Sequence, residues 1–253
     1  MTMTHPRAHT TTTARRLVSL LALMALCGGL VAAIGISSAS ARKATIVGKT
    51  KNTPSPACPK DTGQNPCTAT GRVTGFMTKA DGQKHPFNIF KDGKIVAWSI
   101  DLSKPTKDQY DFFGTLLQND TFGKHPSARI AVIKNKGHGK YKLIKQSPAM
   151  DLKPDLGRKQ TFTLGKPLKV HRGQVIALSL PSWAPAFTGS VSASGNQWRA
   201  SRKSKKCNVD RDHIQNAKAS KAQQKVGSIR PYKCRYSAAR LLYWAYFVPS
   251  KKK

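Results

Sequence analysis

The side chains able to do acid–base or metal chemistry are few in this sequence of 253 residues and stand far apart. All eleven acidic residues are aspartates, so glutamate is absent. Five histidines follow the first forty residues, namely His85, His125, His138, His171 and His213. No two of them have the H-x-H or H-x-x-x-H spacing that places two metal ligands on one strand or helix. We therefore predict no metal site and no cofactor.

Two pairs of aspartates could supply the acid and base of a hydrolase, Asp101 with Asp108 and Asp151 with Asp155. Both pairs lie among prolines and glycines, where aspartate usually caps turns. The sequence also lacks a G-x-S-x-G elbow, a Cys–His signature and a phosphate-binding glycine loop. We therefore predict that the protein is not an enzyme. The alternative is a secreted hydrolase of polysaccharides, which two aspartates, or an aspartate and a histidine, in one cleft would favour.

Positive charge is the strongest signal in the composition. The chain has 44 lysines and arginines, which give a formal net charge of +33. This charge exceeds what solubility requires and destabilises the compact state through self-repulsion. It predicts contact with extracellular polyanions, such as acidic wall polymers, anionic glycans, lipid headgroups or DNA, with a steep dependence on salt. No motif for specific nucleic-acid recognition is present. The alternative is a well-solvated surface with no anionic partner.

The four tryptophans divide into two groups by their surroundings. Trp98 and Trp244 fall inside apolar runs and are predicted core residues. Trp183 and Trp198 have proline or glycine neighbours, where an aromatic ring can stack on a sugar; packing beneath a loop is the competing interpretation. A basic run from Arg202 to Lys206 follows Trp198. The candidate ligand-binding residues are therefore Trp183, Trp198, Arg199, Arg202, Lys203, Lys205 and Lys206.

The first 41 residues have the composition of an export signal. A basic start without acids precedes an apolar run from Leu17 to Ile36, and Ala39-Ser40-Ala41 offers the small residues that a signal peptidase recognises. We predict cleavage after Ala41, which removes three arginines and leaves a net charge of +30. The protein would then be secreted and would contact a membrane only before cleavage. The alternative is an uncleaved anchor, because about twenty apolar residues can span a bilayer.

Four cysteines remain beyond this signal, at Cys58, Cys67, Cys207 and Cys234. An even number of cysteines in an exported chain indicates disulfides, and four cysteines allow three pairings. Closeness in the sequence favours the pairs Cys58–Cys67 and Cys207–Cys234. A zinc site of four thiolates is the alternative, but no two cysteines have the C-x-x-C spacing typical of such sites.

The segments that would position these residues are mostly predicted strands. Residues 173–187, GQVIALSLPSWAPAF, form an apolar run between a turn glycine and prolines, which predicts a strand buried on both faces. Residues 240–248 are equally apolar and predict a strand inside a sheet. Two hairpins are expected, one that pairs residues 86–90 with 93–100 and one that pairs residues 127–134 with 140–147.

Two segments are candidates for helices. Residues 101–123 contain either a short helix capped by Ser103 or Asp108, or an aromatic loop over the edge of a sheet. Residues 210–225 favour a helix with Asp210 at its N-cap.

The pattern of short strands predicts an all-β fold. Nine or ten strands separated by turn residues, without strand–helix alternation, favour an antiparallel β-sandwich of jelly-roll type with one short helix or basic loop near the C-terminus. The expected organisation is a signal at 1–41, a flexible basic leader at 42–57, a single sandwich domain at 58–250 and a basic tail at 251–253.

Several phrases, among them GRVTGFMT, GKIVAWSIDLS, SARIAVIK and ARLLYWAYFVP, resemble secreted actinobacterial β-sandwich proteins of unknown function. The segment VHRGQVIALSLP is similar to a strand of jelly-roll carbohydrate-binding modules, where a glycine turn precedes a buried strand. These resemblances imply export and a β fold without naming an activity. Together with the charge, they lead us to predict a non-catalytic protein that binds anionic glycans or cell-wall polymers. A purely structural surface protein is a further alternative.

Overall fold

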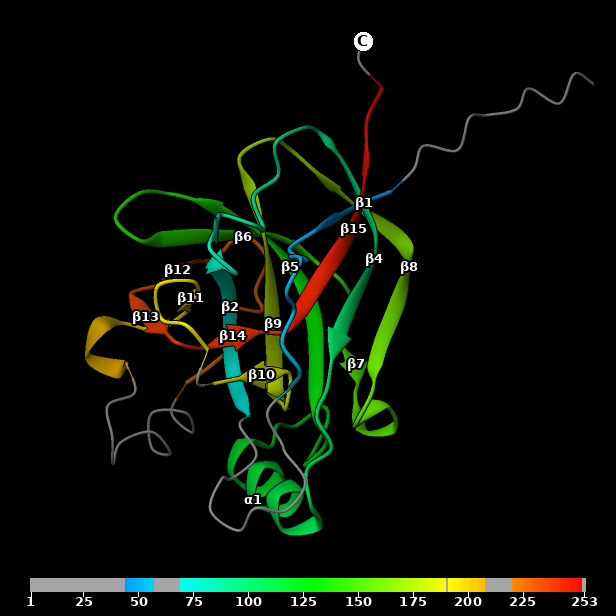
Figure 1. The fold of residues 1–253 in the computed structure, drawn as a ribbon, viewed down its shortest axis with the longest axis vertical. Helices are drawn as coiled ribbons and strands as arrows, with labels where there is room; N and C mark the ends of the chain where they lie inside the picture. Colours follow the sequence, from blue (N-terminus) through cyan, green and yellow to red (C-terminus); the bar gives the residue numbers. More distant parts are fainter. Residues whose placement is uncertain (1–43, 57–68, 190, 208–219, 252–253) are drawn as a thin grey trace, which may run out of the picture. The chain divides into compact units, whose positions relative to one another are not determined.

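A computed structural model describes residues 44–56, 69–189, 191–207 and 220–251. All described elements belong to one compact unit, residues 42–253. The described residues contain fifteen β-strands, one α-helix and two 3-10 turns, and every strand pair is antiparallel (Figure 1). No helix in these ranges is long and apolar enough to cross a membrane.

The larger sheet has a seven-strand path in the order β12-β6-β5-β9-β2-β11-β13, curled into a half-barrel. Its strands are β2 (Thr70–Ala80), β5 (Ser127–Asn135), β6 (Lys140–Gln146), β9 (Gln174–Ala184), β11 (Gln197–Ala200), β12 (Ile229–Pro231) and β13 (Cys234–Ser237). Two short strands extend it, β3 (Gln83–Lys84) beside β2 and β7 (Met150–Asp151) beside β5.

The smaller sheet has four strands in the order β1-β15-β4-β8. They are β1 (Thr45–Val47), β4 (Gly93–Asp101), β8 (Lys159–Val170) and β15 (Tyr243–Pro249). A separate pair is formed by β10 (Phe187–Thr188) and β14 (Arg240–Leu241). In Figure 1 the blue strand β1 lies beside the red strand β15, so segments from the two ends of the unit share this sheet.

The leader at 42–57 was expected to be flexible, and the structure corrects this for part of it. Strand β1 lies in this leader and pairs with β15. The buried Arg240 side chain anchors the residues that follow, since its Nη1 donates to the Asn52 carbonyl at 3.1 Å and its Nη2 to Thr50 Oγ1 at 2.7 Å. β1 has the sequence Thr-Ile-Val, whose β-branched residues suit a strand, and the neighbouring β15 supplies its hydrogen bonds.

The apolar run at 173–187 forms strand β9, and every residue of β9 is buried, as predicted. It pairs with β5 on one side and β2 on the other, which leaves neither edge free. Pro181 cannot donate a ladder hydrogen bond, and it lies where the register with β2 shifts between Gly71 and Val73. The proline is therefore tolerated in a central strand because it coincides with a bulge.

One expected hairpin is confirmed and the other is wrong. Strands β5 and β6 pair as predicted for residues 127–147. Residues 86–90 do not pair with 93–100. The Ile89 amide instead donates to the Gln174 carbonyl at 2.8 Å, and Asn88 forms a bridge with Val175 at the start of β9. The turn around Asp92 therefore leads from the larger sheet into the smaller one, where β4 pairs with β8 and β15.

The single described helix, α1 (Lys107–Leu117), resolves the alternatives for residues 101–123. Its N-cap is Thr106, not Ser103 or Asp108 as expected. The Gln109 amide donates to Thr106 Oγ1 and the Thr106 amide donates to Gln109 Oε1, which completes a capping box. The three-residue spacing between Thr106 and Gln109 is the one that a capping box requires, and it makes Thr106 the N-cap. The helix covers the end of β9 that carries Trp183.

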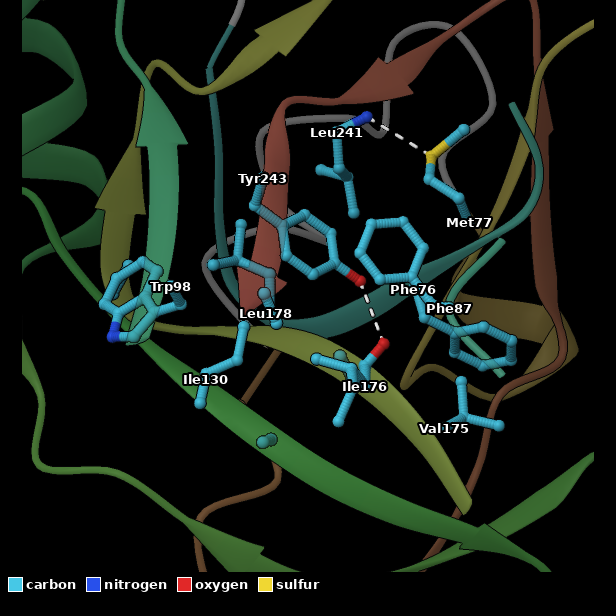
Figure 2. Close-up of a cluster of buried hydrophobic side chains, with 14 of the residues drawn as sticks. Phe76, Met77, Phe87, Trp98, Ile130, Val175, Ile176, Leu178, Leu241 and Tyr243 are labelled. Carbon is cyan, nitrogen blue, oxygen red and sulfur yellow. Dashed lines mark hydrogen bonds between the residues drawn. The ribbon is translucent and has the colours of Figure 1, made fainter. Parts of the chain in front are cut away.

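The core is formed where the smaller sheet packs on the larger one. Figure 2 shows Tyr243 of β15 beside Ile176 and Leu178 of β9. The Tyr243 hydroxyl donates to the Ile176 carbonyl at 3.1 Å, and the Tyr243 ring stacks on Phe87 with a centroid distance of 4.3 Å. The apolar run at 240–248 thus lies inside a sheet, as expected, and Tyr243 joins the two sheets by a hydrogen bond as well as by packing.

Replacing Tyr243 with phenylalanine is expected to make stability less sensitive to alkaline pH. Burial holds the pKa of the Tyr243 phenol well above its ordinary value of 10.0, so this phenol ionises in the unfolded chain at a lower pH than in the folded one. The contribution of this phenol to the free energy of unfolding is therefore complete below about pH 10. Above that pH it falls by about 1.4 kcal/mol per pH unit. Urea unfolding of both proteins across that range measures the effect. The lysines titrate in both proteins, so a constant difference in stability would contradict the assignment.

These observations confirm a mostly β, antiparallel fold. The one helix of the described residues, α1, lies near the middle of the chain, whereas the short helix or basic loop was expected near the C-terminus. Fifteen strands replace the nine or ten expected, because several have only two or three residues and leave no periodic pattern to detect. The strand order does not show a jelly roll, and that finer assignment stays a prediction. Most of the helix expected at 210–225 lies outside the described residues, and residues 220–225 are not helical.

Candidate anion-binding site

A pocket of about 430 Å³ opens beside the end of β11 and is lined mainly by cationic side chains. Among the described residues that line it, five carry permanent positive charge and none carries a carboxylate. The lining residues are Ser201, Arg202, Lys203, Lys206, Ser220, Lys221, Arg230 and Pro231. We call this group of residues the basic pocket.

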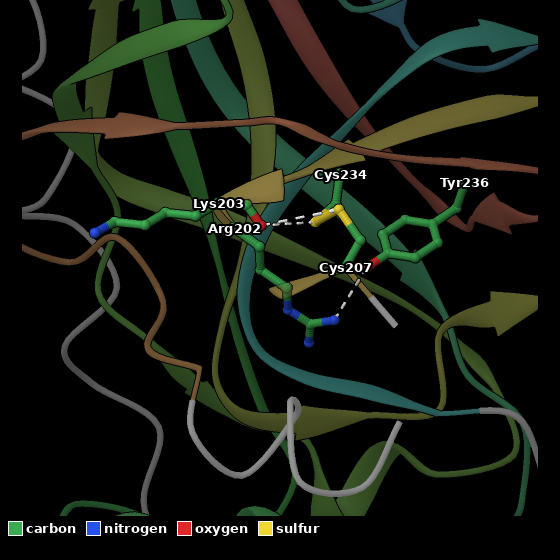
Figure 3. The surroundings of a disulfide bond; sticks show 5 residues. All are labelled: Arg202, Lys203, Cys207, Cys234 and Tyr236. Atoms are coloured by element: carbon green, nitrogen blue, oxygen red, sulfur yellow. Dashed lines mark hydrogen bonds between the residues drawn. A yellow bond between two sulfur atoms is a disulfide. The ribbon is translucent and has the colours of Figure 1, made fainter. Parts of the chain in front are cut away.

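One wall of the basic pocket follows directly from β11. The chain leaves that strand at Ala200 and forms the 3-10 turn η2 (Ser204–Lys206). The disulfide between Cys207 and Cys234 then ties the end of this turn to β13 (Figure 3). The disulfide keeps the neighbouring lysines near the sheet. Without it, the loop that carries them would sample many more conformations in solvent.

Arg202 is the most deeply placed cation of the basic pocket, with 4% of its surface exposed. Its Nη1 donates to the Tyr236 hydroxyl at 3.2 Å, as Figure 3 shows. Its carbonyl accepts from the Lys233 amide at 3.0 Å. Arg202 is therefore held through its guanidinium by Tyr236 of β13 and through its carbonyl by Lys233, the residue before β13.

The opposite wall comes from residues far along the chain. Arg230 lies in β12, and its Nη1 donates to the Lys221 carbonyl at 2.5 Å. Arg72 of β2 holds the same segment, because its Nε donates to the Ser220 carbonyl at 3.0 Å. These bonds attach Lys221 to the sheet and add Lys221 and Arg230 to the pocket that Arg202, Lys203 and Lys206 also line.

The arrangement concentrates positive potential in one concave site. A cleft lined by charges of one sign focuses the field and raises the local concentration of counter-ions. The four ion pairs found among the described residues all lie elsewhere, so no described carboxylate neutralises this pocket. Arg and Lys together can hold phosphate, sulfate or carboxylate groups by charge-assisted hydrogen bonds.

The structure brings together part of the predicted ligand-binding set. Arg202, Lys203 and Lys206 line the basic pocket, whereas Lys205 lies in the same turn without lining it. Arg199 lines a second pocket. Lys221 and Arg230 complete the basic pocket, and sequence reasoning missed both. The only available signal was their position between the two cysteines of the predicted Cys207–Cys234 loop.

Neither candidate tryptophan is placed to stack on a sugar, which corrects that part of the prediction. Trp183 is fully buried within β9, and its indole N–H donates to the Lys124 carbonyl at 2.8 Å. Trp198 is 3% exposed and stacks on Tyr236 with a centroid distance of 4.6 Å. Gly75 makes this packing possible, since a Cβ there would lie 2.8 Å from the Trp198 ring. Both rings are therefore buried core residues, Trp183 against α1 and Trp198 against Tyr236 of β13.

The predicted disulfide Cys207–Cys234 is confirmed. The other predicted pair, Cys58 with Cys67, lies outside the described residues. The confirmed bond is consistent with an oxidising compartment but does not by itself place the protein outside the cell.

Two of the aspartates proposed for hydrolysis, Asp151 and Asp155, each contact a basic side chain. Asp155 is bound by Arg158, and the Asp151 carboxylate lies 2.7 Å from His125 Nδ1. A second such contact joins His171 Nδ1 to Asp92 at 2.9 Å. The Arg172 amide and His171 together lower the pKa of the Asp92 carboxyl.

Both histidine–aspartate contacts are at the surface, and neither lines one of the three pockets described for this chain. No group of three or more potential metal ligands occurs among the described residues.

No family model, curated protein or solved structure matches this chain. The assignment of function therefore depends on the geometry and charge of its own pockets.

Proposed function

We propose that this is a secreted, cationic, disulfide-stabilised β protein that binds extracellular anionic polymers without catalysis. The observation that carries the proposal is the basic pocket, where five of the described lining residues are cationic and none of the described lining residues is a carboxylate. The expected ligands are acidic glycans or cell-wall polymers, and binding would not depend on a specific nucleic-acid sequence.

A polymer suits this site better than a small monoanion. Like charges held close together repel one another, and a single carboxylate would compensate only part of that repulsion. A chain with repeated phosphate or carboxylate groups can place several anions near the pocket and release many counter-ions on binding. The net charge of the whole chain is +33, so cationic side chains outside the pocket would also attract the polymer where it extends beyond the pocket.

Removing three pocket lysines together is expected to weaken polyanion binding by about tenfold or more. The site variant carries Lys203→Gln, Lys206→Gln and Lys221→Gln, all exposed positions whose loss should leave the fold intact. Affinity for labelled poly(glycerol phosphate) is measured by fluorescence anisotropy at several salt concentrations. The slope of log affinity against log salt should also fall by about two to three, because three ionic contacts are lost.

The matched control carries Lys94→Gln, Lys166→Gln and Lys169→Gln in the smaller sheet, which removes the same charge from exposed positions. Its affinity should stay within a few-fold of the wild type. Equal losses in the two variants would show that charge acts without a site. Absence of binding by the wild type at low salt would overturn the proposal and favour a purely structural surface protein. Cleavage of the polymer would favour the hydrolase.

A further inference from the structure

A second pocket, of about 390 Å³, has a different chemistry from the basic pocket. Its lining residues are Phe76, Thr78, His85, Asn88, Asn135, His138, Gly139, Tyr141, Gly173, Val175 and Arg199. We call it the histidine pocket. Its volume is in the range of small-molecule sites in proteins, and the mouth of a curled sheet is a common place for such sites.

The strand register places much of this lining on one face of the curled sheet. Arg199 of β11 pairs with Phe76 of β2, and Asn135 of β5 pairs with Tyr141 of β6. Directly opposed residues in an antiparallel pair point to the same face. The Phe76 and Tyr141 rings meet edge to face at 5.0 Å and form an aromatic base beneath the polar groups. The site is therefore built on paired strands that fix its shape.

Turns contribute the two imidazoles, and both are held in an uncommon backbone conformation. His85 has φ 52° and His138 has φ 50°, in the left-handed region that favours glycine. The His85 backbone is bonded on both sides, since its amide donates to the Thr78 carbonyl at 2.9 Å and its carbonyl accepts from the Asn88 amide at 3.1 Å. Non-glycine residues with this backbone conformation are found most often at ligand sites, where the strain lowers the stability of the fold but holds the side chain in a fixed position.

The charge of the histidine pocket is small for a protein of this composition. Arg199 is its one permanently charged lining residue, and no lysine or carboxylate lines it within the described chain. The neutral polar lining residues include Asn88 and Thr78, whose hydroxyl already donates to Gln197 and can still accept. Asn135 Oδ1 already accepts from the Gly137 amide at 2.8 Å, which leaves the Asn135 amide nitrogen available to donate to a ligand.

We infer that the histidine pocket binds a single hexuronate, a sugar that carries one carboxylate and several hydroxyl groups. One guanidinium offers two parallel N–H groups, which match one carboxylate in a bidentate pair. The amides, the threonine hydroxyl and the imidazoles can exchange hydrogen bonds with sugar hydroxyls. This site is independent of the basic pocket, which would hold a polymer.

Binding of D-glucuronate is the direct test, followed by NMR chemical-shift titration of the purified protein. We expect saturable binding with a Kd of about 1 mM or tighter, at least about tenfold weaker binding of D-glucose, and loss of binding in Arg199→Gln. The variant Lys203→Gln/Lys206→Gln/Lys221→Gln should bind glucuronate as the wild type does. This separates failure of the present inference from failure of the polymer proposal.

A second pair of variants separates a ligand role from a structural one. His138→Gly should weaken glucuronate binding by about tenfold while its thermal midpoint stays equal or rises, because glycine adopts this backbone conformation without strain. Ala238→Gly is the control, since Ala238 has φ 55° and does not line the pocket. Ala238→Gly should relieve backbone strain in the same way and bind glucuronate as tightly as the wild type does.

Four results would overturn the inference. They are no saturable glucuronate binding, glucose binding as tight as glucuronate binding, tighter binding of inorganic phosphate than of glucuronate, and unchanged glucuronate binding in Arg199→Gln or His138→Gly.

Discussion

Replacing Trp183 with alanine is expected to lower the free energy of unfolding by about 3–5 kcal/mol, the usual range for loss of a buried tryptophan. The indole is fully buried and packs against Tyr110 and Phe113 of α1 at centroid distances of 5.4 and 5.5 Å. Its removal leaves a cavity between the helix and β9, and it leaves the Lys124 carbonyl without this donor. Urea unfolding followed by circular dichroism measures the loss.

Trp183→Phe is the matched variant, because it keeps much of the apolar volume and removes the N–H donor. It should lose less stability than the alanine variant, and both variants should bind poly(glycerol phosphate) as the wild type does once folded. If Trp183→Phe folded with full stability and lost affinity for the polymer, then Trp183 would be a ligand residue after all, contrary to its burial.

The second large effect is expected from removing the disulfide with Cys207→Ala and Cys234→Ala. The two residues are separated by 27 positions, and closing a loop of that length contributes about 3.5 kcal/mol in the chain-entropy model. The same bond ties η2, whose Lys206 lines the basic pocket, to β13. We therefore expect polyanion affinity to fall by about tenfold at a temperature where the variant is still folded.

Two measurements on this variant, urea unfolding and poly(glycerol phosphate) titration, separate the effects. Glucuronate binding at the histidine pocket should persist, since that pocket is built on other strands. A loss of stability with unchanged polymer affinity would show that η2 keeps its position without the bond. A loss of glucuronate binding as well would indicate general unfolding.

The parts of the fold that the sequence predicts well are those with a strong local pattern. β9 and β15 follow from apolar runs too long to be exposed, and the β5–β6 hairpin follows from two strands around a glycine-containing turn. In each of these segments the local pattern of apolar and turn residues favours one structure. The contacts with the rest of the fold favour the same structure.

Other parts depend on contacts that no local pattern reveals. Residues 86–90 look like the first strand of a hairpin, yet they pair with the start of β9 because Phe87 and Ile89 are buried against the core. Trp198 has glycine and serine neighbours typical of a loop, but β11 lies between β2 and β13 and buries it. Burial across a sheet is decided by distant strands, so sequence neighbours were misleading there.

The candidate site shows the same division. The basic run from Arg202 to Lys206 was visible because its residues are consecutive, and it supplies one wall of the basic pocket. Lys221 and Arg230 reach that pocket only through the fold. Arg199 belongs to a strand, where its register opposite Phe76 directs it to the histidine pocket. Charge density can be counted from a sequence, whereas the face on which a charge lies requires the strand pairing.

The pairing of β1 with β15 has a consequence for the order of folding. Thr45 Oγ1 donates to the Phe247 carbonyl across a separation of 202 residues, and β15 is the strand that separates β1 from β4. While the chain emerges from a ribosome or an export channel, β4 therefore has an unpaired edge until residues 243–249 are released. Joining such distant segments is slow, because closing a long loop costs conformational entropy before any stabilising contact forms. The smaller sheet is thus completed only after synthesis of β15, in a single late step.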